Sequence, residues 1–270
     1  MFSSLLSMFG TLTEAHGKPP VLIGATGGSG TRALHSALST AGLFMGERLN
    51  GAGDAMDFEP FLDDWINPIL DTTRGLDYGP ATLDRSALED FKAALTTYRT
   101  EHPGGDALWG WKNPRSMYVL PLIHSVYPDL CFLHLVRDGR DMALSDNQNQ
   151  ARKHYAALFG QPVGDITPER SIKLWAKANN DVADWAERVL ANRYLRIRFE
   201  DLCASPGSHL RSVFILLGLD GTSLEAAVAA ALPSISKPAS VNRWRALPED
   251  DASQLTNLAK PVLERFGYAL

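Results

Sequence analysis

The chain has 270 residues, 45 % hydrophobic and 21 % charged, which is ample for one α/β domain with a large core. Its formal net charge of −5 argues against a nucleic-acid-binding protein, because the basic residues are not gathered into a strongly basic domain. With only two cysteines, Cys131 and Cys203, and no run of 18 apolar residues, we expect no structural disulfide, no transmembrane segment and a cytoplasmic location.

The beginning of the chain carries little structural signal. Residues 1–18 lack the positively charged start of a signal peptide. We therefore expect an N-terminal arm over 1–18 and one folded domain over 19–270.

The first predicted element is a short buried strand at 21–23, followed by an amphipathic helix that ends near Gly42. Between them runs a glycine-rich turn, Gly24-Ala25-Thr26-Gly27-Gly28-Ser29-Gly30-Thr31-Arg32. Small residues let the backbone approach an anion, and the N-terminus of a helix favours negative charge. This segment is therefore predicted to bind phosphate.

The glycine-rich turn alone is compatible with several classes of nucleotide site. It is not a Walker A loop, because Thr31 follows Gly30 where a nucleotide hydrolase needs lysine. It also matches the opening of short-chain dehydrogenases, with Arg32 available for the 2′-phosphate of NADP. No tyrosine in the chain has a lysine four residues later, so the catalytic pair of those enzymes is missing.

A second informative stretch is the apolar run 130–136, which predicts a strand buried on both faces. Asp138 and Asp141 follow it at the N-cap and N3 spacing of a helix. Arg137 is thus expected at the carboxyl end of a core strand, where ligands of open α/β sheets bind, and Ser145 follows two helical turns later. Alternatively, Arg137 only pairs with the neighbouring Asp138.

The remaining periodicity predicts helices at about 168–190, 210–217, 224–232 and 251–265, and a strand at 194–199. Residues 146–167 are rich in Asn, Gln, Gly and Pro and are expected to form a surface excursion that could cover the substrate. Strands that alternate with helices predict a single α/β domain with a central parallel sheet flanked by helices.

Three motifs in chain order carry a family resemblance: Ser29-Gly30-Thr31, Arg137 with Ser145, and Phe199-Glu200-Asp201-Leu202. Together they resemble the sulfotransferases that use 3′-phosphoadenosine 5′-phosphosulfate (PAPS), which have a P-loop-like nucleotide-binding fold. The resemblance implies that Arg137 and Ser145 bind the 3′-phosphate and that Phe199 packs on adenine. It also implies a phosphosulfate site formed by Gly27, Gly28, Ser29, Gly30, Thr31 and Arg32.

A late basic segment, 237–245, is similar to the loop that closes over the nucleotide in this family. The resemblance implies that Lys237, Arg243 and Arg245 supply further cations to the donor. A solvated basic loop is the alternative interpretation.

The resemblance also suggests catalytic residues. Lys112 lies 25 residues before Arg137, about the interval at which family members place a catalytic lysine. The chain lacks the lysine that cytosolic aryl and steroid sulfotransferases carry at the position of Gly28, and Arg32 could replace it. Asp54 and Asp57 are the candidates for the base, as in members whose acid follows the first helix.

We therefore predict a metal-independent sulfotransferase that moves a sulfuryl group from PAPS to a hydroxyl, or an amine, of a small molecule or glycan. In-line transfer of this kind depends mainly on positioning and on charge stabilisation. The alternatives are an NADP-dependent reductase of the short-chain type and a non-catalytic nucleotide-binding protein. The loops that shape the acceptor pocket carry no sequence pattern that identifies the acceptor.

Overall fold

A parallel sheet in the strand order β2-β1-β3-β4 forms the centre of the computed structural model, which describes residues 18–101, 107–162 and 164–270. The strands are β1 (Val21–Gly24), β2 (Gly110–Lys112), β3 (Cys131–Val136) and β4 (Tyr194–Arg198). β1 pairs in parallel with β2 on one side and with β3 on the other. Such strands are buried on both faces, which explains their continuous apolar sequences.

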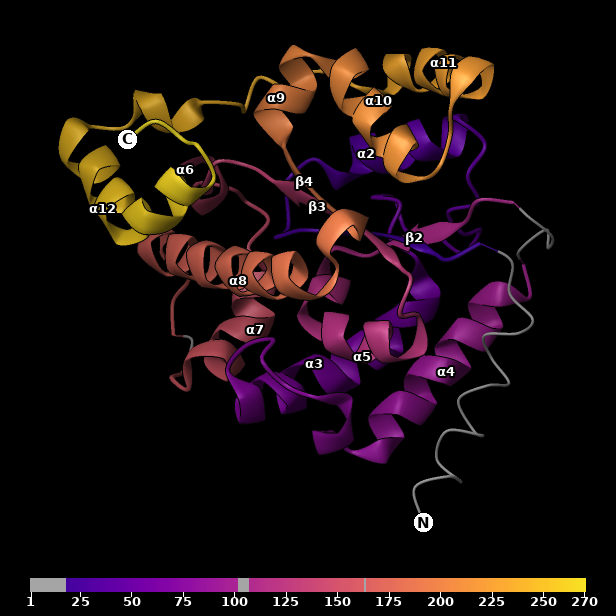
Figure 1. Cartoon of the computed structure of the whole chain (residues 1–270). Helices are drawn as coiled ribbons and strands as arrows, with labels where there is room; N and C mark the ends of the chain where they lie inside the picture. The colour runs from indigo at the N-terminus through magenta and orange to yellow at the C-terminus, as the bar shows by residue number, and fades with distance from the viewer. Residues whose placement is uncertain (1–17, 102–106, 163) are drawn as a thin grey trace.

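One face of the sheet is covered by helices from two separate parts of the chain. These are α2 (Thr31–Thr40), α9 (Phe199–Ala204), α10 (Pro206–Leu216) and α11 (Gly221–Ala231). They lie above the strands in Figure 1. Their apolar residues form one core cluster with the sheet.

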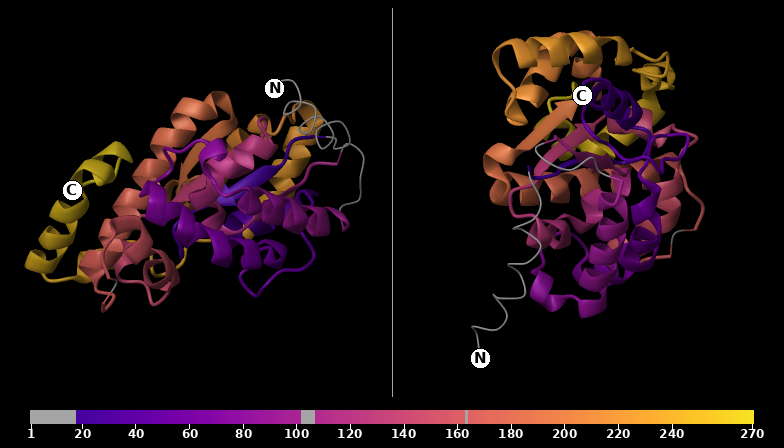
Figure 2. Two further views of the ribbon diagram at one scale, coloured as in Figure 1. Left: turned by 90° about the horizontal axis from the view of Figure 1, so that it is seen from below. Right: turned by 90° about the vertical axis from the view of Figure 1, so that its right-hand side faces the viewer.

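The opposite face is covered by α3 (Glu59–Thr73), α4 (Arg85–Arg99), α5 (Leu120–Val126), α7 (Asn149–Phe159) and α8 (Pro168–Val189). They lie below the strands in Figure 1, and the second view of Figure 2 shows the same separation of layers. This side holds a second and larger core cluster, rich in aromatic rings.

The two clusters divide the strand residues by alternation. Val21 and Ile23 belong to the cluster under α2, whereas Leu22 belongs to the cluster on the other face. Leu133 and Phe132 of β3 are divided in the same way. Successive side chains of a strand point to opposite faces, so one short apolar run stabilises both layers.

The C-terminal helix α12 (Glu249–Arg265) packs against α8 and the short helix α6 (Gly139–Ala143). It lies at one edge of the molecule in Figure 1 and in the first view of Figure 2. Short 3-10 segments complete the chain at Met56–Phe58, Pro80–Thr82, Pro114–Val119, Ala191–Arg193, Leu232–Ser234 and Arg243–Ala246.

The predicted single α/β domain with a parallel sheet is confirmed, as are the helices near 168–190 and at the C-terminal end. The surface excursion expected at 146–167 is wrong, because α7 occupies half of it and buries His154 and Tyr155 against the core. The predicted arm at 1–18 falls almost entirely outside the described residues. None of the described helices combines the length and apolar character needed to cross a bilayer.

Candidate active site

The carboxyl ends of the strands meet at one edge of the sheet around a cavity of about 530 Å³. Ligands of open α/β sheets bind in this position. The loop after β1, Lys112 at the end of β2, Arg137 after β3 and Phe199 after β4 all reach it. Its walls comprise Gly27, Gly28, Gly30, Thr31, Arg32, Ala33, Ser36, Ala52, Asp54, Lys112, Pro114, Arg137, Asn147, Phe199, Ser234, Ser236 and Pro238.

The glycines of the first loop are required by its backbone. Gly28 and Gly30 have φ values of 86° and 87°, a region that side chains disfavour. A Cβ on Gly30 would lie 2.2 Å from Cε2 of Phe199, so the aromatic ring occupies the space that a side chain would need. Gly30 is also the N-cap residue of α2 and makes no side-chain cap, while Thr31, Arg32 and Ala33 of the first turn line the cavity. The loop therefore fits an anionic group such as a phosphosulfate.

Ser29, in contrast, does not line the cavity. Its side chain is buried, and its hydroxyl donates a 2.7 Å hydrogen bond to the carbonyl oxygen of Thr26 in the same loop. The hydroxyl therefore stabilises the loop from behind, and any contact of Ser29 with a donor would be made through the backbone.

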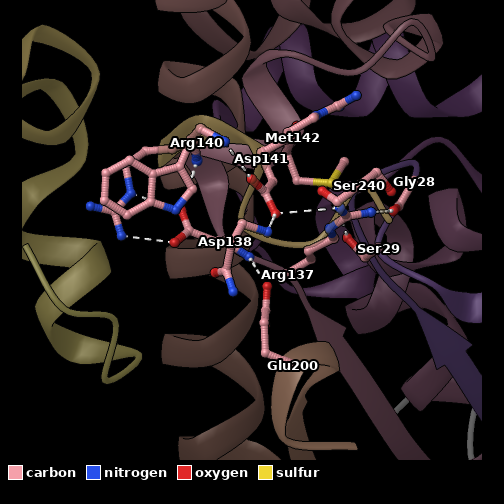
Figure 3. Close-up of polar contacts among 12 residues, drawn as sticks. Gly28, Ser29, Arg137, Asp138, Arg140, Asp141, Met142, Glu200 and Ser240 are labelled. Carbon is pink, nitrogen blue, oxygen red and sulfur yellow. Dashed lines mark hydrogen bonds and ion pairs between the residues drawn. The ribbon is translucent and has the colours of Figure 1, made fainter. Parts of the chain in front are cut away.

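Arg137 is 6 % exposed and lies between the glycine loop and the late basic segment (Figure 3). Its Nη1 donates to the carbonyl of Gly28 at 3.4 Å, and its Nη2 donates to Asp141 at 3.3 Å and to the carbonyl of Ser240. Its Nε is buried and has no partner among the described residues. A buried guanidinium with an unused donor beside a cavity fits the binding of a phosphate.

Of the two carboxylates expected to cap the helix after β3, Asp138 does so and Asp141 does not. Asp138 caps α6 by accepting the N–H of Arg140 at 2.9 Å, as predicted. Asp141 instead accepts the backbone N–H of Asn242 at 2.7 Å and that of Trp244 at 3.1 Å. The carboxylate thus attaches the late basic segment to the end of β3.

This attachment brings Arg243 close to Arg137. Arg243 donates from Nε and Nη2 to the carbonyl oxygen of Asp141, at 3.2 and 2.6 Å. Burial, and then the charge of Arg137, lower the pKa of Arg243. Two neighbouring guanidinium groups repel each other unless an anion lies between them, which fits the predicted 3′-phosphate site.

None of the three predicted cations of this segment, Arg243 included, is part of the cavity wall. Arg245 stacks on Trp244, with its guanidinium carbon 4.7 Å from the ring centroid, while Arg140 stacks on the same ring at 3.6 Å. Lys237 is exposed between two residues of the cavity wall, Ser236 and Pro238. Donor binding by Lys237, Arg243 and Arg245 stays a prediction.

Ser145 lies beside the glycine loop rather than in the cavity wall. A Cβ on Gly28 would be 3.4 Å from its hydroxyl oxygen, which accepts the N–H of Asn147 at 3.2 Å. Asn147 itself lines the cavity and was not predicted. No local pattern marks it, because it reaches the site only through the fold.

Lys112 and Asp54 form an ion pair in the cavity wall. The side chain of Lys112 is 1 % exposed, and its ammonium group also donates to the carbonyl oxygen of Ala52 at 2.6 Å. Burial lowers the pKa of Lys112, the ion pair with Asp54 opposes this shift, and the charge of Arg32 lowers the pKa further. The predicted Lys112, Asp54 and Arg32 are thus brought together.

Asp54 is held in place by its own loop. Its second carboxylate oxygen accepts from the amide of Asn50 at 2.9 Å, and its backbone N–H donates to the same side chain at 3.0 Å. Asp57 lies elsewhere: it pairs with Arg48 at 2.7 Å and is not part of the cavity wall. Of the two carboxylates predicted as the base, the fold brings Asp54 to the cavity.

Sequence reasoning missed His35, which lies on α2 behind the ion pair. It is 7 % exposed, and burial, followed by the charge of Lys112, lowers its pKa. A Cβ on Gly53 would lie 3.0 Å from its Nδ1, so the ring packs against the loop that carries Asp54. The sequence signal that could have pointed to His35 is its position on the apolar face of the predicted helix.

Solved structures share the fold. The sulfotransferase domain of the olefin synthase of Synechococcus PCC 7002 has a TM-score of 0.56 and 20 % identity, covering 95 % of this chain and 97 % of that domain. The sulfotransferase STF9 of Mycobacterium avium has a TM-score of 0.54 and 12 % identity, covering 99 % of this chain and 82 % of that protein.

Sequence comparison adds relatives and a family. The chain is 25 % identical over 108 residues to omega-hydroxy-beta-dihydromenaquinone-9 sulfotransferase Stf3 of Mycobacterium bovis and of Mycobacterium tuberculosis. The match spans 40 % of this chain and 28 % of those relatives. The model of the sulfotransferase family matches residues 19–223. On this match, and in agreement with its fold, the chain belongs to the sulfotransferase family.

Proposed function

We propose that the protein transfers a sulfuryl group from PAPS to a hydroxyl, or an amine, of a small-molecule or glycan acceptor. One observation carries the proposal: a single cavity joins the glycine loop to Arg137 on one side and to the Lys112–Asp54 pair on the other. The two sides are separate because β2 and β3 flank β1. Sulfotransferases use PAPS, a donor with anionic groups at both ends of its nucleotide.

The donor site would use the residues predicted for it. The glycine loop and Thr31 would hold the 5′-phosphosulfate, and Arg137 with Ser145 would hold the 3′-phosphate, with Arg243 as a further cation. Phe199, whose ring lies 5.7 Å from the guanidinium carbon of Arg137, would pack on the adenine. Once bound, the donor would supply a sulfuryl group attached to a phosphate leaving group, and positioning and charge stabilisation would carry the transfer.

Lys112 and Arg32 would stabilise the charge that develops during transfer. Two hydrogens of the Lys112 ammonium point to Asp54 and Ala52, and an ammonium group has three. The third can donate to an oxygen in the cavity. Arg32, exposed at the start of α2, adds a second cation. Fixed cations in a pre-arranged site stabilise the leaving phosphate without further reorganisation.

Asp54 would act as the base. A new S–O bond forms to the acceptor oxygen while the bond from sulfur to the bridging oxygen breaks, and its electron pair stays on the 5′-phosphate. The proton of the acceptor hydroxyl passes to the Asp54 carboxylate. The loop that holds Asp54 keeps its carboxylate in the cavity wall, and a general base must lie within reach of the proton that it accepts.

Nucleotide binding tests the first half of the proposal. Calorimetry is expected to show binding of 3′-phosphoadenosine 5′-phosphate and no binding of NADPH at the same concentration. Selective binding of NADPH would instead support the reductase considered from the sequence.

Transfer of labelled sulfate tests the second half. The panel of acceptors contains a primary alcohol, a phenol, a sugar and an amine, with an ω-hydroxylated isoprenoid added because the curated relatives are named for such a substrate. Transfer of label from ³⁵S-labelled PAPS to one of them supports the enzyme. Tight nucleotide binding with neither transfer nor donor hydrolysis would support a non-catalytic nucleotide-binding protein.

A further inference from the structure

A line of buried polar side chains crosses the core behind the glycine loop. The hydroxyl of Tyr194 in β4 lies 2.9 Å from Nδ1 of His134 in β3, and Nε2 of His134 lies 2.9 Å from Oδ1 of Asn179 in α8. The amide nitrogen of Asn179 lies 3.4 Å from the hydroxyl oxygen of Thr26, which lies 3.3 Å from that of Ser29. We call these five residues the polar line.

Chemistry fixes the direction of each hydrogen bond along the polar line. The amide nitrogen of Asn179 donates to the carbonyl of Trp175 at 2.7 Å, so its oxygen must face His134 and accept. Nε2 of His134 therefore carries the hydrogen. Burial lowers the pKa of His134 to about 3, so the ring is neutral and Nδ1 accepts from the hydroxyl of Tyr194.

The orientation of Asn179 also sets the direction of the hydrogen bonds of Thr26 and Ser29. Because Thr26 accepts from Asn179, its own hydrogen is available for Ser29, whose hydroxyl donates to the Thr26 carbonyl at 2.7 Å. From Tyr194 to Ser29, each side chain of the polar line thus donates to the next one, in the direction from β4 to the glycine loop. Bonds aligned in this way strengthen one another, and a buried polar group left without a partner is costly.

The same helix also holds the other side of the donor site. One turn before Asn179, the indole of Trp175 donates to the carbonyl oxygen of Arg137 at 2.9 Å. The ring of Trp175 also packs where a side chain on Gly139 would lie, with a Cβ there only 2.4 Å away. α8 thus contacts the backbone at Arg137 through Trp175 and the glycine loop through Asn179.

We propose that Asn179 and His134 are positioning residues that hold the glycine loop in its anion-binding conformation through Thr26 and Ser29. Neither residue lines the cavity, so their effect on the donor is indirect. The inference rests on the proposed function, because it concerns the 5′ end of the same nucleotide. It predicts a selective effect: loss of the polar line weakens binding of the 5′-phosphate and spares binding of the 3′-phosphate.

Two nucleotides separate this effect from a general loss of structure. 3′-Phosphoadenosine 5′-phosphate uses both ends of the site, whereas adenosine 3′-monophosphate lacks the 5′ group. For Thr26→Val and His134→Phe, calorimetry is expected to show a dissociation constant of the bisphosphate raised about 3- to 30-fold, the range typical of residues along a coupled network. The constant for the monophosphate is expected to stay within about twofold of wild type.

Matched variants complete the test. Thr26→Ser keeps the hydroxyl and is expected to restore wild-type binding of the bisphosphate. Thr73→Val removes a hydroxyl that bonds the carbonyls of Ile69 and Gly75 at 2.9 and 2.7 Å, away from the site, and is expected to leave both constants unchanged. If His134→Phe does not fold, Tyr194→Phe takes its place in the test, because it removes only the first donor of the polar line.

The outcomes are distinct. An equal loss of both nucleotides in the His134 or Tyr194 variant, or no loss of either, overturns the positioning role. A selective loss in Thr26→Val alone also overturns it, since His134 would then not contribute. If the wild-type protein binds neither nucleotide, the proposed function itself fails.

Discussion

The buried carboxylate of Asp141 accepts the backbone N–H of Asn242, 101 residues later, at 2.7 Å. The same oxygen accepts from the guanidinium of Arg137 at 3.3 Å. The late basic segment and the strand-end arginine therefore share one anchor. This relationship explains how a loop far along the chain is held beside Arg137 at the cavity.

Asp141→Asn is expected to destabilise the protein and loosen this segment. An amide presents an N–H₂ group to donors that need an acceptor, and breaking a buried ion pair costs about 3–5 kcal/mol. Urea denaturation measures the loss. Asp129→Asn is the control, because its pair with Arg193 at 3.4 Å is largely exposed and such pairs contribute about 1 kcal/mol or less. Equal losses in the two variants would show that Asp141 is not an anchor.

Arg137→Ala is expected to weaken binding of 3′-phosphoadenosine 5′-phosphate by about one to two decades, since a charge-assisted hydrogen bond contributes about 1.5–3 kcal/mol. Calorimetry on the folded variant measures the constant, and Ser145→Ala should act in the same direction more weakly. The exposed Arg152→Ala controls for the loss of one positive charge. Wild-type affinity in Arg137→Ala would remove Arg137 from the donor site.

Lys112→Ala is expected to lower the turnover number about 10²- to 10³-fold at saturating donor, with a smaller change in KM for the donor. The reason is that its charge matters most when negative charge moves to the leaving phosphate. Lys177→Ala is a matched control, because Lys177 forms a similar pair with Asp181 at 2.7 Å outside this cavity. Near-normal turnover in Lys112→Ala would leave Arg32 as the catalytic cation.

Asp54→Asn is expected to lower turnover about 10²- to 10⁴-fold and to leave affinity for the nucleotide nearly intact, because a base acts on the acceptor. Steady-state kinetics and calorimetry separate the two quantities. Asp57→Asn breaks the pair with Arg48 and is expected to affect stability more than turnover. The reverse pattern would move the base to Asp57.

Stability is expected to fall as the pH drops from about 6 to 4. Burial lowers the pKa of both His134 and His154 to about 3. Above pH 6.5 each ring is neutral in the folded and the unfolded chain, so the pH has no effect through it. Below that value the unfolded chain takes up a proton that the folded chain excludes, and unfolding becomes more favourable by about 1.4 kcal/mol per pH unit for each histidine.

Urea denaturation at several pH values measures how steeply the free energy of unfolding depends on pH. His134→Gln is expected to reduce this slope by the contribution of one proton, about 1.4 kcal/mol per pH unit. The slope is independent of any constant loss that the substitution causes. An unchanged slope in His134→Gln would show that the ring is protonated in the folded protein.

Local patterns were sufficient for several parts of the proposed donor site. The apolar run before Arg137 predicted β3, and the glycines between a strand and an amphipathic helix predicted the loop before α2. Both signals are encoded within a few residues, by continuous burial on two faces and by backbone angles that only glycine adopts readily. The parallel sheet followed from strands that alternate with helices.

The tertiary structure decided which charged groups meet. Lys112 pairs with a carboxylate 58 residues earlier, and only the fold distinguishes Asp54 in the cavity wall from Asp57 beside Arg48. α7 was missed because its polar sequence carries a weak apolar stripe, although packing against α3 buries His154. Sequence patterns report the burial and geometry of each segment. The partners of a charge, in contrast, depend on which segments the packed core brings into contact.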